Sequence, residues 1–423
     1  METLTIPPRQ RPVEATVVLP GSKSDTNRAL LLAALAEGTS VIEGALFAED
    51  TGYMARALQA LGFAVVDDPA SQRFTVTGAG GAIPATTADL FIGNAGTAAR
   101  FLTAACALGH GRYRLDGVPR MRQRPIQPLL DGLAQLGGRA RSILGTGCPP
   151  VLIEGQGLTG GTARLPGDTS SQFISALLMV APYARDGVTI EVVGPLVSAP
   201  YLDLTTAVMA AFGVQVETAP GPRFVVAPGQ RYRARHYRVE PDATAASYFF
   251  AAAAVTGGRV RIPGLTRQSR QGDIRFVEVL AAMGCAVTWG PDFIEVQGPD
   301  ALRGVTVDMR DISDTALTLA AIAPLATTPT EIRGLAHTRH QETDRVHALA
   351  TELQRLGVPV EELPDGLRIR PAAVQPGVVE TYHDHRIAMS FAVLGLRVPG
   401  IGLRNPQCVR KTFPDFFDRL AAL

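Results

Sequence analysis

Residues 57–66 read ALQALGFAVV, a short amphipathic helix that ends in a glycine and runs into a strand, and four similar segments follow it. They are GLAQLGGRAR (132–141), VMAAFGVQVE (208–217), VLAAMGCAVT (279–288) and ELQRLGVPVE (352–361). Their glycines lie 71 to 76 residues apart, at Gly62, Gly137, Gly213, Gly284 and Gly357. A glycine suits a helix C-terminus that needs a left-handed residue. The repetition indicates that the chain is built from similar units.

A second kind of helix alternates with the first, and its starts are just as evenly spaced. These starts lie near Thr26, Thr97, Ser170, Asp242, Ser313 and Asp384. Each helix is rich in alanine and almost uncharged after its first turn, so we expect it to be buried on all sides. Several of the starts carry residues of the N-cap type. The combined pattern predicts an α/β fold of six β-α-β-α-β-β repeats.

Three repeats in each globule predict two domains. One would span residues 21–240, and the other would join 241–423 to residues 1–20, with RARHYRVEPDAT (233–244) as the linker. The sixth unit ends in the helix FPDFFDRLAAL (413–423), with no strands after it. We expect the segment EATVVLP (14–20) to fill that gap, which is why residues 1–20 are assigned to the C-terminal domain.

Composition excludes several classes of protein. The 423 residues carry a formal net charge of +1, without the basic excess of a protein that coats nucleic acid. Four scattered cysteines without a C-x-x-C pair argue against a disulfide scaffold or a zinc ribbon, and the histidine spacing fits no metal motif. The start METLTIPPRQRP has no apolar core of a signal peptide. We therefore expect a cytoplasmic protein without a metal, membrane or nucleic-acid partner. A monomer without a cofactor is expected as well.

The basic residues are unevenly divided. Of the 40 lysines and arginines, only Lys23 and Lys411 are lysines. A genome that prefers arginine codons explains the majority but not the two exceptions. A compact ammonium group fits where a guanidinium fork does not. We therefore expect at least one of the two lysines to be functional.

Polar residues gather at the starts of the buried helices. The first start reads GSKSDTNR (21–28), the second GNAGT (93–97) with Arg100, and the third GDTSSQ (167–172). The later starts carry Pro241-Asp242, Ser313-Asp314 and Asp384-His385-Arg386. Helix N-termini attract anions. If the helices of each domain run parallel, their starts line a cleft suited to a substrate with several negative charges.

Single motifs leave alternatives open. Ser170 and Ser171 fit a plain N-cap as well as a phosphate ligand. The loop PRMRQRPI (119–126) fits a solvated surface or an arginine clamp for phosphate and carboxylate. Glu342 fits a helix-capping acid or a proton-transfer acid. Polar residues nevertheless occur at the starts of all six buried helices. This coincidence favours a binding site for an anionic substrate over six unrelated helix caps.

Together these residues resemble the 5-enolpyruvylshikimate-3-phosphate (EPSP) synthase family. The resemblance covers nearly the whole chain, in order, through LPGSKS-x-TNRALLLAALA (19–36), GNAGTA-x-R (93–100), PRMRQRPI (119–126), SSQF-x-SALLM (170–179), SAPY (198–201), SD-x-A (313–316), ETDR (342–345), DHR-x-AM (384–389) and KTFP (411–414). It implies a two-domain, inverted α/β barrel-like enolpyruvyl transferase fold with three repeats per domain.

The resemblance also implies a reaction and its residues. The enolpyruvyl group of phosphoenolpyruvate would pass to the 5-hydroxyl of shikimate 3-phosphate by addition and elimination, releasing phosphate. The implied catalytic residues are Lys23, Asp314 and Glu342. The implied shikimate 3-phosphate ligands are Lys23, Ser24, Arg28, Ser170, Ser171, Gln172, Ser198, Tyr201, Asp314, His337 and Gln341. The implied phosphoenolpyruvate ligands are Lys23, Asn94, Gly96, Arg124, Gln172, Arg345, Asp384, Arg386 and Lys411.

Three positions depart from the family's usual pattern. Gln341 stands where the motif K-E-T-D-R has lysine, which removes a cation near the reacting groups. His337 replaces a more usual asparagine. Phe101 stands where many relatives have proline, and we expect it to alter the turn at Gly96 and the response to glyphosate-like inhibitors.

Two other functions remain as alternatives. A sister enolpyruvyl transferase acts on UDP-N-acetylglucosamine, but that family has a cysteine in the loop equivalent to 119–124, and this loop has none. A non-catalytic relative that lost turnover through Gln341 would keep anion binding without releasing phosphate.

Overall fold

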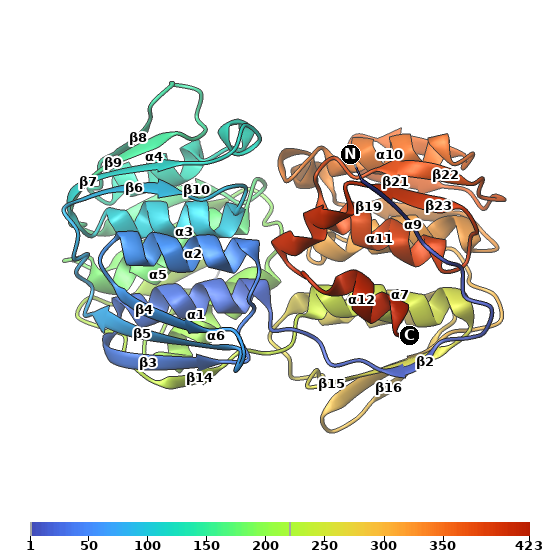
Figure 1. Cartoon of the computed structure of the whole chain (residues 1–423). Helices are drawn as coiled ribbons and strands as arrows, with labels where there is room; N and C mark the ends of the chain where they lie inside the picture. Colours follow the sequence, from blue (N-terminus) through green and yellow to red (C-terminus); the bar gives the residue numbers. More distant parts are fainter. Residues whose placement is uncertain (1, 220) are drawn as a thin grey trace. The chain divides into compact units, whose positions relative to one another are not determined.

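The computed structural model describes residues 2–219 and 221–423. These residues form two compact units. The middle unit is Gly21–Val239, and the terminal unit joins the N-terminal segment up to Pro20 with Glu240–Leu423. Figure 1 colours the middle unit blue to green, and the terminal unit mostly yellow to red. Each unit has its own apolar core.

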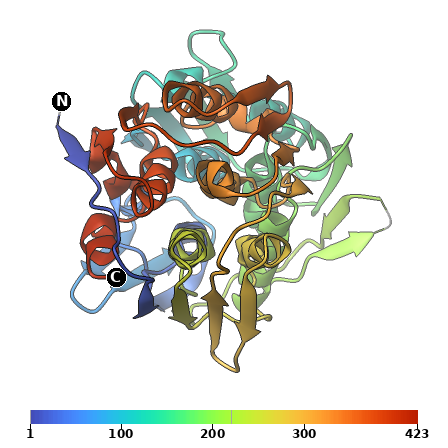
Figure 2. The same cartoon turned by 90° about the vertical axis from the view of Figure 1, so that its right-hand side faces the viewer.

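Helices with almost every side chain buried form the centre of each unit. In the middle unit these are α1 (Lys23–Leu35), α3 (Gly96–Cys106) and α5 (Ser171–Val180). In the terminal unit they are α7 (Ala243–Thr256), α9 (Ala316–Ile322) and α11 (His385–Gly395). Beyond its second turn none of these helices carries a charged residue, which is why each can lie inside a core. In Figure 2 α7 is viewed almost along its axis.

Each repeat adds a small sheet in which one strand pair is parallel and the rest are antiparallel. The middle unit has the strand orders β14-β3-β5-β4, β6-β7-β9-β8 and β10-β11-β13-β12. Their bounds are β14 (His236–Arg238), β3 (Glu37–Glu43), β5 (Arg73–Ala79), β4 (Ala64–Asp68), β6 (Thr87–Phe91), β7 (His110–Asp116), β9 (Val151–Gln156), β8 (Ala140–Ser142), β10 (Gly161–Pro166), β11 (Val188–Val193), β13 (Arg223–Val226) and β12 (Glu217–Ala219).

The terminal unit repeats this pattern with one strand fewer. Its strand orders are β2-β15-β17-β16, β18-β19-β21-β20 and β1-β23-β22. Their bounds are β2 (Glu14–Thr16), β15 (Arg259–Pro263), β17 (Phe293–Gln297), β16 (Ala286–Trp289), β18 (Thr306–Asp308), β19 (Thr330–Arg333), β21 (Gly366–Ile369), β20 (Val360–Leu363), β1 (Thr3–Thr5), β23 (Ile401–Arg404) and β22 (Gly377–Glu380).

The second set of helices lies beside the sheets. It comprises α2 (Glu49–Ala60), α4 (Gln127–Gln135), α6 (Pro200–Ala211), α8 (Phe276–Ala282), α10 (Arg345–Arg355) and α12 (Phe416–Ala421). The first five end at the repeated glycines, whose φ angles are 89°, 85°, 93°, 108° and 77°. The predicted left-handed helix ends are therefore confirmed.

The role expected for residues 14–20 is wrong. Strand β2 pairs in parallel with β15 in the sheet of the fourth repeat, and β1 instead pairs antiparallel with β23 in the sixth. The reason is the open edge beside β15. The residues just before α7 form β14, which pairs in parallel with β3 in the first sheet and so leaves β15 without a leading strand.

The segment 233–244 therefore contains more than a linker. Strand β14 lies inside it, with His236 opposite Val41 and Arg238 opposite Glu43. In each unit the first sheet gains a strand that is distant in sequence. In the middle unit this strand is β14, which pairs with β3, and in the terminal unit it is β2, which pairs with β15. Within the described ranges no helix is long and apolar enough to cross a bilayer.

Two glycines, Gly52 within α2 and Gly62 just after its end, should respond to alanine with opposite signs. At Gly52 a methyl group would meet only the flexible Arg56 guanidinium, at 3.0 Å, and alanine favours a helix by about 0.5–1 kcal/mol over glycine. At Gly62 φ is +89° and the methyl would lie 2.9 Å from Pro84 Cβ, so strain of about 1–2 kcal/mol is expected. Thermal melting should show Gly52→Ala stabilised and Gly62→Ala destabilised. Equal shifts in both variants would contradict this.

Candidate active site

Arg345 connects the starts of two buried helices in the terminal unit. It is the first residue of α10, and its side chain is 2% exposed. Its Nε and Nη2 donate to the two carboxylate oxygens of Asp384, at 2.8 and 3.3 Å. Its Nη1 donates to Oδ1 of Asp314 at 2.9 Å. Asp384 is the N-cap of α11, and Asp314 lies in the 3-10 turn (Ser313–Thr315) before α9.

Arg386 approaches Asp314 from another side. Its Nη2 donates to Oδ2 of Asp314 at 2.7 Å, and its Nη1 donates to the Tyr248 hydroxyl on α7 at 3.4 Å. Asp314 thus receives one guanidinium on each carboxylate oxygen. Burial raises the pKa of Tyr248 to about 12. The predicted convergence of helix starts is realised in this unit, because side chains of α7, α9's leading turn and α11 form one network.

Glu342 lies between two cations. Its Oε2 is 3.0 Å from Nη2 of Arg345, and its Oε1 is 3.5 Å from Nζ of Lys411. Lys411 ends the 3-10 turn Pro406–Lys411, and both side chains are 7% exposed. Burial by itself would lower the pKa of Arg345, but Asp384, Glu342 and Asp314 outweigh it and raise that pKa above its usual value. Arg345 therefore stays charged inside the protein.

One of the unusual residues, Gln341, joins the same network, and a second, His337, contacts Ser313 beside Asp314. Gln341 accepts a hydrogen bond at Oε1 from Nη1 of Arg345. A lysine at this position could not accept that bond, so glutamine gives Arg345 a neutral partner. His337 Nε2 lies 2.9 Å from Ser313 Oγ. Burial lowers the pKa of His337 to about 4, so the ring is neutral at neutral pH.

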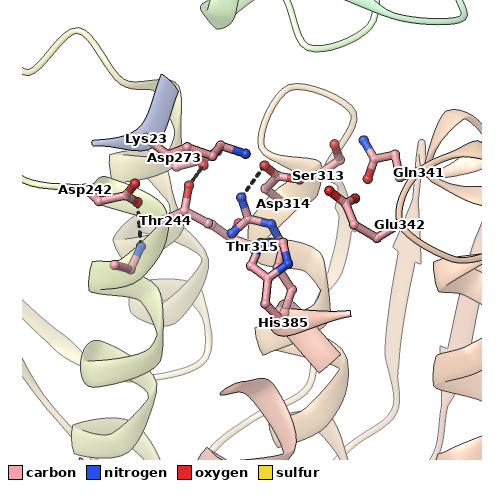
Figure 3. A network of polar contacts seen from close by, with 12 residues as sticks. Lys23, Asp242, Thr244, Asp273, Ser313, Asp314, Thr315, Gln341, Glu342 and His385 are labelled. Atoms are coloured by element: carbon pink, nitrogen blue, oxygen red, sulfur yellow. Dashed lines mark hydrogen bonds and ion pairs between the residues drawn. The ribbon is translucent and has the colours of Figure 1, made fainter. Parts of the chain in front are cut away.

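Asp273 belongs to this site although no sequence motif indicated it. Thr244, in the first turn of α7, donates a hydrogen bond to its Oδ2. Burial and then the charge of Asp314 raise the pKa of Asp273 to about 7. Asp242 caps α7 by accepting from the Ala245 amide at 2.8 Å. Figure 3 shows Asp242, Thr244 and Asp273 grouped at the start of α7.

Lys23 begins α1 in the middle unit. It is 9% exposed, and its Nζ lies 3.9 Å from Oδ2 of Asp50 at the start of α2. Ser22 caps the helix by accepting from the Asp25 amide. One of the two lysines of the chain is therefore held, almost buried, at a helix start.

Arg28 donates within the middle unit. Its guanidinium bonds to Thr205 Oγ1 at 2.8 Å, to the carbonyl oxygen of Ser24 at 2.8 Å and to that of Tyr201 at 3.1 Å. It also lies 5.2 Å from the ring centre of the buried Phe101. Burial lowers the pKa of Arg28 to about 10. Arg28 thus ties α1 to α6, and Phe101 packs on Arg28.

Gly96 leaves space for Arg124 at the start of α3. A methyl group on Gly96 would lie 2.5 Å from Nη2 of Arg124. Nη1 of Arg124 donates to the main-chain and side-chain oxygens of Asn94, at 3.0 and 3.1 Å. Arg122 instead pairs with Asp116 at 2.8 Å. These two arginines of the loop therefore have different partners, since Arg124 binds Asn94 at the start of α3.

The start of α5 holds the serine pair. Ser170 is the N-cap and accepts from the Gln172 amide at 3.2 Å, while Ser171 is buried. Ser198 has φ +54°, an uncommon conformation for a residue other than glycine, and its carbonyl accepts from the Tyr201 amide. Ser170 therefore is the helix cap, one of the two roles left open for the serine pair. The Ser171 hydroxyl lies at the same helix start.

The site residues expected from sequence divide between the two units. The middle unit holds Lys23, Ser24, Arg28, Asn94, Gly96, Arg124, Ser170, Ser171, Gln172, Ser198 and Tyr201. The terminal unit holds Asp314, His337, Gln341, Glu342, Arg345, Asp384, Arg386 and Lys411. Across the described part of the chain, no three His, Cys, Asp or Glu side chains are grouped as a metal site would need.

Comparison with known proteins gives one consistent result. A family model described as EPSP synthase (3-phosphoshikimate 1-carboxyvinyltransferase) matches residues 8–420. The 3-phosphoshikimate 1-carboxyvinyltransferase of Trichormus variabilis is 54% identical, with 99% of this chain and 98% of that protein covered. The chloroplastic protein of that name from Petunia hybrida is 46% identical, covering 96% and 83%.

Solved structures agree with this result. An EPSP synthase from Acinetobacter baumannii has a TM-score of 0.83 at 26% identity, covering 100% of this chain and 98% of that one. The enolpyruvyl transferase NikO from Streptomyces tendae has a TM-score of 0.79 at 21% identity, with 100% and 97% covered, a similarity of fold alone. The predicted fold class is confirmed.

Asp273 should make stability depend on pH. Its pKa is raised in the folded chain, so folding takes up a proton, and the stabilisation is lost as pH rises from about 4 to about 7. The variant Asp273→Asn has no such proton, and its melting temperature should rise relative to wild type between pH 5 and pH 8. The exposed Asp67→Asn serves as the control. A difference that stays constant with pH would contradict the prediction.

Proposed function

Because the chain belongs to the EPSP synthase family, it transfers the enolpyruvyl group of phosphoenolpyruvate to the 5-hydroxyl of shikimate 3-phosphate, and we propose that the residues at the helix starts perform this reaction. One observation carries the proposal. Arg345, Arg386 and Lys411 are almost buried, and each lies against a carboxylate at the start of a helix or turn. Buried cations of this kind suit an anionic substrate.

Phosphoenolpyruvate brings a phosphate and a carboxylate that need several cations. In the terminal unit Arg345, Arg386 and Lys411 would hold it, with Asp384 orienting Arg345. In the middle unit Lys23, Asn94, Gly96, Arg124 and Gln172 would take part. Forked guanidinium groups pair well with phosphate and carboxylate. Gly96 contributes by leaving room for the Arg124 fork.

Shikimate 3-phosphate would be held mainly by hydroxyl and amide groups. Its ligands would be Lys23, Ser24, Arg28, Ser170, Ser171, Gln172, Ser198, Tyr201, Asp314, His337 and Gln341. Arg28 has most of its donors engaged within the middle unit, so it would act chiefly by fixing Ser24 and Tyr201. The neutral His337 suits a hydrogen bond to a substrate hydroxyl.

The chemistry requires two proton transfers in each step. In the addition, the 5-hydroxyl oxygen bonds to C2 of phosphoenolpyruvate, its proton passes to Asp314, and C3 receives a proton from Glu342. In the elimination, C3 returns a proton to Glu342, the C2–O bond to phosphate breaks, and the leaving phosphate takes up the proton that Asp314 had accepted. Lys23 would stabilise the charge that develops near the phosphate bridge oxygen.

Substrate binding would change the state of both carboxyl groups. In the structure, Asp314 and Glu342 are neutralised by Arg345, Arg386 and Lys411. Anionic groups of phosphoenolpyruvate would take over these cations. The carboxylates would then lose their compensating charge, and a carboxylate without a nearby cation binds a proton more tightly. The same ion pairs thus hold these side chains in place in the structure, and their exchange for substrate anions would create a proton-transfer pair.

Gln341 is compatible with this mechanism. It accepts a hydrogen bond from Arg345 and adds no charge, so loss of the family's usual lysine leaves the three cations around Asp314 and Glu342 in place. The two alternatives are less well supported. A non-catalytic relative would not need both proton-transfer carboxyls, and the matched relatives carry the name of the shikimate enzyme. A monomeric state and a cytoplasmic location remain predictions.

Phosphate release tests the function directly. Wild-type protein should release phosphate only when phosphoenolpyruvate and shikimate 3-phosphate are both present. Lys23→Met should reduce the rate at least about 100-fold, because a buried cation at the reacting groups is lost, while Gln341→Lys should retain turnover. A folded wild-type chain that binds a substrate but releases no phosphate would refute the enzyme function and favour the non-catalytic alternative.

Gly96→Ala should weaken phosphoenolpyruvate binding selectively. The added methyl would lie 2.5 Å from the Arg124 guanidinium and displace it. We expect the KM for phosphoenolpyruvate to rise about 10-fold or more, with the KM for shikimate 3-phosphate within about twofold. Gly52→Ala, where the methyl meets only a flexible side chain, is the matched control. Equal increases in both KM values would contradict a role limited to Arg124.

A further inference from the structure

The turn before α11 has an unusual backbone. Tyr382 and His383 are consecutive residues other than glycine with φ angles of +53° and +57°. Side chains with a Cβ avoid this left-handed region, and such conformations persist where the surroundings hold them in place. The next residue is Asp384, the buried N-cap of α11 and the partner of Arg345. The strained pair therefore directly precedes a residue of the active site.

A buried carboxylate on α10 holds this turn. Glu352 is 1% exposed, and its Oε1 accepts from the Tyr382 hydroxyl at 2.7 Å. Its Oε2 accepts from the Glu380 amide at 3.0 Å. Arg355 lies 3.0 Å from Oε1 and supplies the compensating charge. Burial, followed by the hydrogen bond to Glu352, raises the pKa of Tyr382, so the phenol remains a donor.

Two side chains of helix α10 bind the segment 380–384, one near each end of that segment. Arg345, at its first residue, binds Asp384, and Glu352, seven residues later, binds Glu380 and Tyr382. Residues seven apart lie on the same face of a helix, two turns from each other. The distance along α10 between Arg345 and Glu352 thus sets the position of Asp384 relative to Arg345. Asp384 in turn accepts from the Arg386 amide at 2.9 Å.

We propose that Glu352, acting through Tyr382, is a positioning residue for phosphoenolpyruvate binding. It keeps residues 382–383 in their left-handed conformation, so that Asp384 orients the Arg345 guanidinium and the first turn of α11 that carries Arg386. Neither Glu352 nor Tyr382 is among the residues assigned above to substrate. The inference rests on the function proposed above, which assigns Arg345 and Arg386 to phosphoenolpyruvate.

The test uses the full chain and varies one substrate at a time. Tyr382→Phe removes one hydroxyl, and Glu352→Gln removes the charge while keeping the shape. Both should raise the KM for phosphoenolpyruvate about 10-fold and leave that for shikimate 3-phosphate within about twofold. The double variant should not exceed the larger single effect, because both changes break the same connection. Tyr113→Phe, which removes the buried hydroxyl that donates to the Ala85 carbonyl at 2.8 Å, is the matched control and should change neither KM.

The outcomes distinguish a positioning role of Glu352 from a purely stabilising role, and they distinguish failure of this proposal from failure of the proposed function. Amide hydrogen exchange across residues 381–386 should become faster in Tyr382→Phe, a readout that needs no turnover. Unchanged KM values in a variant with a lowered melting temperature would overturn the proposal and leave Glu352 a purely structural group. Equal increases in both KM values would overturn it as well. A wild-type chain without turnover would refute the function and, with it, this role.

Discussion

The six buried helices can lie inside apolar cores only if their polar ends are satisfied. The first N–H groups of a helix have no partner within it, and a buried polar group without a hydrogen bond is costly. Caps at Ser22, Ser170, Asp242 and Asp384 meet part of this need. Because the helix bodies carry no charge beyond the second turn, charged side chains concentrate at the starts. The location of the candidate site therefore follows from the way the core is built.

The same constraint explains why the site contains carboxylates facing cations. A buried guanidinium such as that of Arg345 is unfavourable unless carboxylates surround it. Asp384, Asp314 and Glu342 provide that surrounding in the described structure. Under the proposed function, substrate anions would offer an alternative partner for the same cations. One exchange of ion pairs would then link the stability of these buried groups to their reactivity.

Sequence reasoning was most successful where a local conformation has a local cause. The glycines at the helix ends are left-handed as predicted, since the conformation depends on the residue itself. It failed for the short N-terminal strands. Strands β1 and β2 have three residues each, too few to contain a period, and their partners are set by which sheet edges remain open. Asp273 was missed for a related reason. It lies in no motif, and its raised pKa arises only from its burial and from the neighbouring Asp314 in the folded chain.

The sequence by itself determined the repeat, the family and the identity of most charged groups at the helix starts, because spacing, composition and motif order are properties of the linear chain. Only the tertiary structure decided which of those groups meet. Arg28 turns inward to Thr205, Gln341 becomes an acceptor for Arg345, and Glu352 reaches Tyr382. Such pairings join residues from separate elements, up to 177 positions apart in the chain. Their geometry depends on how helices pack, and packing is a collective result of the whole core.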